Sequence, residues 1–82
     1  MEHHDLKTWP IYYNRVVSGD KMFELRKNDR DFQTGDMVTL KEYDLLSNSY
    51  TGRFKTFEIS YILHGGQFGI EPGYCVFGLH IA

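Results

Sequence analysis

The sequence predicts an α+β domain that is mostly β: a small mixed β-barrel of about five strands with one early helix. Short β-like runs recur along the chain between turn signals, whereas only one segment near the N-terminus has helical spacing. Aromatic residues make up 16% of the chain, and such large side chains fill a small core efficiently. A chain of 82 residues has room for one core, so we expect residues 1–82 to form a single domain.

The N-terminal part of the chain carries the helix. A short opening strand is expected over His3–Lys7, and Pro10 fits the first turn of the helix, with Thr8 or Trp9 as its cap. Gly19 supplies the residue with positive φ that commonly ends a helix. The apolar positions expected to face the sheet are Ile11, Tyr12, Val16 and Val17.

The remaining elements are strands joined by turns. Thr34-Gly35-Asp36 is a turn signal, and residues 47–52 are expected to form a loop or hairpin tip. A glycine-rich loop is expected from His64 to Gly73. The strands are Met22–Arg26, Met37–Tyr43 with Val38, Leu40 and Glu42 on one face, Phe54–Leu63 with Phe57, Ile59, Tyr61 and Leu63 on one face, and Tyr74–Ile81.

Charge is nearly balanced, with a formal net charge of −2, so the chain lacks the global basic field of many nucleic-acid binders. Basic residues nevertheless outnumber acidic ones from Lys7 to Arg30, which permits a local basic patch. The one cysteine, Cys75, cannot form an internal disulfide, and no apolar run resembles a signal peptide or a membrane span. We therefore expect a cytoplasmic protein without a membrane partner, with Cys75 buried and inert.

The most informative segment is SGDKMFELRKNDR at residues 18–30, which contains a G-x-K-x-x-E-x-R pattern at Gly19, Lys21, Glu24 and Arg26. Glycine permits a turn with positive φ, and the residues after it alternate as in a strand. Alternation places Glu24 and Arg26 on one strand face, with the Lys21 ammonium beside the turn. A small domain that concentrates charge on one strand face is typical of a binder of anionic or polar ligands.

Two interpretations of these charges remain open. Lys21 and Glu24 can form a structural salt bridge, or they can act in a cleft as acid, base or phosphate clamp. Arg26, Lys27 and Arg30 form a basic cluster that can bind a phosphate or a base edge. The same cluster can instead stay solvated in a loop, balanced by neighbouring aspartates.

Several other side chains are candidates for the same site. Lys7 and Trp9 lie where the helix begins, and the positive end of a helix favours anions. Trp9 can pack the helix on the barrel or stack on a base, and Tyr50 and Arg53 flank a Thr-Gly turn that can line a cleft. The four histidines and Cys75 match no zinc-ligand spacing, so we expect neither a metal nor a cofactor.

The motif resembles the signature of the ASCH domain, the activating signal cointegrator homology domain, which belongs to the PUA-like superfamily of small β-barrels. The whole chain is similar to an uncharacterised bacterial and phage subgroup of single-domain proteins. The resemblance implies a PUA-like barrel that binds RNA in a cleft between helix and barrel. The matching blocks are H-x-L-K-x-W-P at 4–10, F-E-x-R-K-N-D-R at 23–30, T-G-D at 34–36, Y-T-G-R at 50–53 and Y-I-L-x-G-G at 61–66.

Binding of RNA or a nucleotide-like ligand in a basic cleft is therefore the first functional hypothesis. The second is a small hydrolase acting on a modified nucleoside or RNA, with Lys21 and Glu24 as the catalytic pair. The resemblance to the small amidohydrolase branch breaks at Glu24, where that branch has a nucleophilic threonine, so its activity is not carried over. The third is a protein-interaction module or phage accessory factor, and we expect a monomer. The expected ligand-binding residues are Lys7, Trp9, Gly19, Lys21, Glu24, Arg26, Lys27, Arg30, Tyr50 and Arg53.

Overall fold

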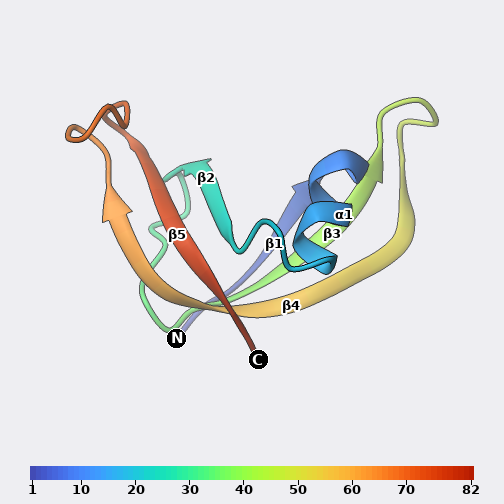
Figure 1. Cartoon of the computed structure of the whole chain (residues 1–82), viewed down its shortest axis with the longest axis horizontal. Coiled ribbons are helices and arrows are strands. Elements are labelled where there is room, and N and C mark those ends of the chain that lie inside the picture. The colour runs from blue at the N-terminus through green and yellow to red at the C-terminus, as the bar shows by residue number, and fades with distance from the viewer.

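The computed structural model describes residues 1–82 as one curled five-stranded sheet with a single short helix (Figure 1). The sheet order is β1-β3-β4-β5-β2, with β1 parallel to β3 and every other neighbouring pair antiparallel. This mostly β, mixed architecture with one early helix confirms the predicted fold class. The elements are β1 (His3–Thr8), α1 (Pro10–Val17), β2 (Phe23–Lys27), β3 (Met37–Asp44), β4 (Ser49–His64) and β5 (Tyr74–Ile81).

The long strand β4 gives the sheet its shape. Its first part pairs with β3 and its last part with β5, and register shifts interrupt both ladders, between Lys41 and Tyr43 and between Ile59 and Ile62. Such irregularities bend a strand and increase its twist. Figure 1 shows β4 curving under the molecule into two arms, with α1 inside the curve. The sheet is therefore a half-barrel whose edge strands, β1 and β2, do not pair with each other.

The core lies between the concave face of the sheet and α1. Its buried hydrophobic residues form one cluster, to which the sheet and the helix both contribute. Val38, Leu40 and Glu42 are all buried, as the alternation along β3 predicts. The largest fully buried side chains are Phe32, Phe57, Phe77, Leu40 and Ile59.

Two predictions about β4 are wrong. The strand begins at Ser49 and the hairpin tip lies at residues 45–48, because Ser49 and Tyr50 pair with β3 and this pairing overrides their local turn preference. Tyr61 is 69% exposed, and Ile62 is buried in its place. The register shift after Ile59 is the cause, since a slip in register reverses which residues face the core.

Helix α1 begins at Pro10 and ends as the sequence predicts. Trp9 is its N-cap residue, with extended backbone and no side-chain hydrogen bond to the helix. Gly19 follows the last turn at φ +86°, and its amide donates to the carbonyl of Val16 at 3.1 Å, as in a Schellman motif. No helix of the structure is long and apolar enough to cross a membrane.

The buried face of α1 differs from the predicted one. Tyr13 and Val16, one turn apart, are the residues that face the sheet. The predicted inward positions Ile11, Tyr12 and Val17 are exposed, because a helix of two turns presents only one narrow stripe to the sheet. Three apolar side chains of the helix are thus free to contact solvent or a ligand.

A buried carboxylate, Asp36, ties the N-terminus to the turn before β3. Its Oδ1 accepts from the Glu2 amide at 3.0 Å, and its Oδ2 accepts from His4 Nε2 at 2.9 Å and from the Gln33 amide at 3.0 Å. Burial by itself raises the pKa of this carboxyl. The hydrogen bonds and the neighbouring His4 ring outweigh burial and hold the pKa below its ordinary value of 3.8.

We expect the Asp36 contacts to make the fold sensitive to acid. Because the pKa of the folded carboxyl lies below that of the unfolded chain, its stabilisation is present above pH 3.8 and is lost as the pH falls through the folded value. Asp36→Asn should lower the free energy of unfolding at neutral pH by about 1–3 kcal/mol and flatten its decline in acid. Urea unfolding at a series of pH values measures both effects. An unchanged acid response in Asp36→Asn, matching the control Asp29→Asn at an exposed carboxylate, would contradict this assignment.

Candidate ligand-binding cleft

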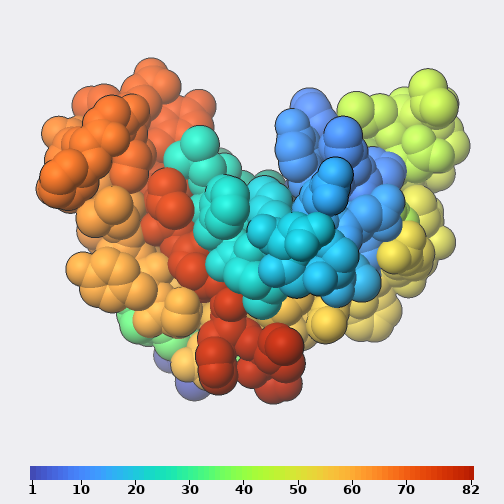
Figure 2. Space-filling model, viewed as in Figure 1, coloured from blue at the N-terminus to red at the C-terminus, as the bar shows by residue number.

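A cleft of about 970 Å³ opens between β2 on one side and the end of β1 with α1 on the other. Figure 2 shows it as the hollow between the cyan residues of β2 and the blue residues of β1 and α1. The hollow follows from the topology, because no strand pairing closes the half-barrel at this edge. Its lining consists of Lys7, Thr8, Trp9, Tyr12, Arg15, Asp20, Lys21, Phe23, Glu24, Leu25 and Arg26.

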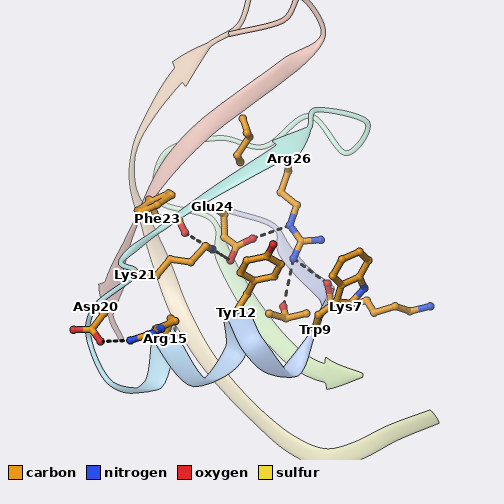
Figure 3. Close-up of a pocket in the computed structure, with 11 residues that line it drawn as sticks. Lys7, Trp9, Tyr12, Arg15, Asp20, Lys21, Phe23, Glu24 and Arg26 are labelled. Carbon is orange, nitrogen blue, oxygen red and sulfur yellow. Dashed lines mark hydrogen bonds and ion pairs between the residues drawn. The ribbon is translucent and has the colours of Figure 1, made fainter. Parts of the chain in front are cut away.

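Glu24 holds two cations in the wall of this cleft (Figure 3). Its Oε1 accepts from Lys21 Nζ at 2.8 Å, and its Oε2 accepts from Arg26 Nε at 2.8 Å. The Glu24 side chain is 5% exposed, whereas the two cations are partly exposed. The predicted Lys21–Glu24 pair is confirmed, and Arg26 completes a charged triad. Two cations share one anion, so the triad gives the cleft a net positive charge.

The Arg26 guanidinium also links the two edge strands of the half-barrel. Its Nη2 donates to the Lys7 carbonyl at 2.9 Å and to the Thr8 hydroxyl at 3.3 Å. Arg30, just after β2, donates to the carbonyl of Asp5. Asp5 and Lys7 are alternate residues of β1, so their carbonyls point to the same side of the strand. The two arginines therefore satisfy the open edge of β1 and connect it to β2 without a strand ladder.

An aromatic wall stands beside the triad. Trp9 and Tyr12 stack with ring centroids 6.1 Å apart and planes at 27°, and each residue is 47% exposed. Lys21 Nζ lies 5.1 Å from the Phe23 ring centroid and also donates to the Phe23 carbonyl at 2.8 Å. The interpretation of Trp9 as a core residue is wrong. Trp9 is the N-cap residue and lies outside the stripe of Tyr13 and Val16 that faces the sheet. Its side chain lines the cleft instead.

Half of the predicted binding residues line this cleft. Gly19 does not line it but forms the turn that leads from α1 to Lys21. The motif therefore has the arrangement that the sequence analysis expected, a glycine turn followed by a strand whose charged side chains line the cleft. The predicted residues in the lining are Lys7, Trp9, Lys21, Glu24 and Arg26.

The other predicted residues lie outside the cleft. Lys27 and Arg30 line a smaller cavity of about 190 Å³ that shares Arg26 with the cleft. Tyr50 and Arg53 lie on β4, and neither belongs to the cleft lining.

Arg53 instead supports α1. Its Nη1 lies 3.6 Å from Oε2 of the buried Glu42, and its guanidinium lies 4.9 Å from the centroid of the Tyr13 ring. These contacts bind the side chain against the helix.

Sequence reasoning missed the other lining residues. Tyr12 and Arg15 are one turn apart on α1, so helical spacing could have indicated that they share a face. Phe23 and Leu25 are exposed while the charged Glu24 points inward, which reverses the usual preference for buried apolar side chains. Only the tertiary structure shows this reversal, because it depends on what the inner face of β2 meets. The residues missed are Thr8, Tyr12, Arg15, Asp20, Phe23 and Leu25.

Two reactive groups outside the cleft, Cys75 and Tyr13, are buried among packed neighbours. Cys75 is fully buried, and burial raises the pKa of its thiol above 9.0, as expected for an inert cysteine. Burial also raises the pKa of the Tyr13 hydroxyl above 10.0, although Arg53 opposes this shift and Glu42 adds to it. No three His, Cys, Asp or Glu side chains are grouped so that they could hold a metal ion. The partly exposed charged side chains of Lys21 and Arg26, in contrast, lie together at the cleft.

Comparison with known proteins places the chain in a family. A family model described as "Domain of unknown function (DUF3850)" matches residues 3–79. The chain belongs to the DUF3850 family. The "Uncharacterized 12.9 kDa protein in GpA 3'region" of Escherichia phage P2 is 36% identical over 50 residues, which cover 61% of this chain and 44% of the phage protein. The match spans less than half of the phage relative, and it confirms the predicted likeness to phage proteins.

We expect the triad to stabilise this DUF3850 domain strongly. Glu24→Ala leaves Lys21 and Arg26 without their anion, so the free energy of unfolding should fall by about 3 kcal/mol. Urea denaturation measures the change. The control Glu71→Ala removes an exposed carboxylate that has no ion pair and should change stability by less than about 0.5 kcal/mol. Equal effects of the two substitutions would show that the triad does not hold the edge strands together.

Proposed function

We propose that this DUF3850 domain binds a nucleotide unit, either free or within RNA, in the cleft between α1 and β2. The observation that carries the proposal is the Lys21–Glu24–Arg26 triad in the wall of a cleft of about 970 Å³. Binding sites for small organic ligands commonly measure roughly 300–1,000 Å³. A nucleotide fits within that range.

Electrostatics support an anionic or carbonyl-rich ligand. The Glu24 carboxylate fixes both cations at 2.8 Å, so their positions are set before a ligand arrives. Preorganised donors lose less conformational freedom on binding than free lysine and arginine side chains would. Lys21 and Arg26 remain partly exposed and can donate to phosphate oxygens or to base carbonyls. Lys7 and Arg15 add positive charge to the same lining, whereas Glu24 and Asp20 are its acidic residues.

The aromatic wall supports recognition of a base. Trp9 and Tyr12 are each half-exposed and offer π faces beside the triad. Bases stack on such rings with a gain of about 1–3 kcal/mol per base. An aromatic face next to fixed cations matches the two chemical parts of a nucleotide, the flat base and the charged phosphate.

The finer family assignment is part of the proposal. The G-x-K-x-x-E-x-R pattern resembles the signature of the ASCH domain in the PUA-like superfamily, and its charged residues converge on one cleft here. The curled five-stranded sheet with one early helix is compatible with a PUA-like barrel. Nucleotide or RNA binding is the function that this likeness implies.

A second candidate is hydrolysis of a modified nucleoside or RNA, because Lys21 and Glu24 lie 2.8 Å apart in a cleft. The contacts favour binding over this reaction. Both Glu24 oxygens already accept from cations, and Lys21 Nζ donates to Glu24 and to the Phe23 carbonyl. The carboxylate is thus placed to anchor the cations, with little surface open to an attacking water.

The binding proposal predicts a loss of affinity when one cation is neutralised. Lys21→Gln leaves a slightly shorter polar side chain and removes its charge, so Kd for the ligand should rise by roughly 10- to 100-fold. Quenching of Trp9 fluorescence during titration with nucleoside monophosphates and short RNA measures this change. The control Lys55→Gln alters a β4 lysine outside the cleft and should leave Kd unchanged.

Three outcomes separate the candidate functions. Saturable binding that Lys21→Gln weakens and added salt reduces supports the proposal. Conversion of a modified nucleoside or RNA to product, detected by chromatography and lost in Lys21→Gln at a temperature where circular dichroism shows the variant folded, would favour the hydrolase. No binding of any nucleotide or RNA at low salt would refute the proposal and favour a module that binds a protein partner.

A further inference from the structure

A second group of aromatic and basic side chains lies next to the cleft, on the arm formed by β3 and β4. Tyr43 and Tyr50 pack edge to face, with ring centroids 5.0 Å apart and planes at 81°. Lys7 Nζ lies 4.1 Å from the centroid of the Tyr43 ring, and Lys41 Nζ lies 5.0 Å from that of Tyr50. We name these four residues the tyrosine platform.

The strand register places the platform on one face of the sheet. Lys7 of β1 is opposite Lys41 of β3, and Tyr43 is opposite Tyr50 of β4. Residues directly opposite each other project from the same face, and alternate residues of β3 share that face. The intervening residue, Glu42, is buried on the other side. The platform therefore lies on the face opposite the core, where Tyr50 is 51% exposed.

The two lysines of the platform have no ion-pair partner. Lys7 and Lys41 form no ion pair with any carboxylate of the chain. Their ammonium groups lie against aromatic rings instead, so both charges are available to an anionic ligand. An arrangement in which lysines alternate with aromatic rings is typical of surfaces that bind single-stranded nucleic acid, where rings stack on bases and cations contact phosphates.

Lys7 connects the platform to the cleft. The residue lines the cleft, while its ammonium lies over Tyr43. Figure 3 shows its side chain directed away from Glu24 and the two cations of the triad. A chain of nucleotides leaving the cleft past Lys7 would thus meet the platform next, with no acidic side chain of the triad between them.

We infer that the natural ligand is a single-stranded polynucleotide, with one nucleotide in the cleft and a neighbouring one on the tyrosine platform. This inference rests on the proposed function. A free nucleotide would be satisfied by the cleft alone and would leave the platform unused. Two lysines without an ion pair, each beside an aromatic ring, match a chain of successive phosphates and bases instead.

The test compares ligands of two lengths. Wild-type protein is titrated with each of the four nucleoside 5′-monophosphates, and with a fluorescein-labelled RNA octamer and DNA octamer of randomised sequence. Removal of the Tyr50 ring in Tyr50→Ala should weaken octamer binding by roughly 5- to 150-fold, the range expected for one lost stacking contact, and leave mononucleotide binding unchanged. Tyr50→Phe keeps the ring and should retain octamer affinity.

Two controls keep the result specific. Tyr61→Ala removes a tyrosine of β4 that is 69% exposed but lies outside the platform, and it should leave octamer affinity unchanged. Lys41→Gln should reduce the slope of log Kd against log salt concentration by about 0.7, the value expected for one lost phosphate contact on a single strand. This slope still tests the platform if Tyr50→Ala proves to fold poorly.

The outcomes distinguish the inference from the function on which it rests. Tighter binding of the RNA or the DNA octamer than of any mononucleotide, lost in Tyr50→Ala, supports a polynucleotide ligand. Whichever octamer binds with the lower Kd shows whether that ligand carries ribose or deoxyribose. Mononucleotide binding with no gain for either octamer, and no effect of Tyr50→Ala or Lys41→Gln, overturns the inference and leaves the proposed function standing. If no mononucleotide and neither octamer binds, both the inference and the proposed function are overturned.

Discussion

The contact on which the rest of the structure depends is the Glu24 carboxylate between Lys21 and Arg26. A carboxylate that is 5% exposed is costly unless both of its oxygens are paired, and here each accepts from a cation at 2.8 Å. The Nη2 atom of Arg26 also donates a hydrogen bond to the Lys7 carbonyl on β1, the other edge strand. One buried anion thus fixes the distance between β1 and β2, and that distance sets the width of the cleft.

The half-barrel uses polar side chains where a closed barrel would use a strand ladder. β1 is held at its start by the His4–Asp36 contact and near its end by the hydrogen bonds from Arg26. These contacts leave room between the edges, and the side chains that bridge the gap also line it. Stability and the proposed binding therefore draw on the same residues, so substitutions within the triad are expected to affect both properties. Variants at the margin of the cleft and on the platform are better suited to separating them.

The proposed function and the polynucleotide inference share one physical basis, which is placement of cations beside aromatic rings. In the cleft the cations are anchored by a carboxylate, whereas on the tyrosine platform Lys7 and Lys41 have no anionic partner in the chain. The first arrangement favours a defined geometry, as recognition of one nucleotide requires. The second favours contact with any successive phosphate and base. Together they are the basis of the proposal that this member of the DUF3850 family binds a short single strand.

The sequence by itself determined the fold class, the Schellman turn at Gly19 and the pairing of Lys21 with Glu24, because glycine conformation, strand alternation and charge at short spacing are local properties. It did not determine that Ile62 replaces Tyr61 in the core, since a register shift between two strands is not encoded by the pattern of one strand. It named Trp9 as a candidate for the site but left open whether the ring packs on the barrel, and it did not place Tyr12 at the cleft. That depended on how the curled sheet brings β1 and α1 against β2, which long-range packing and the link through Arg26 decided.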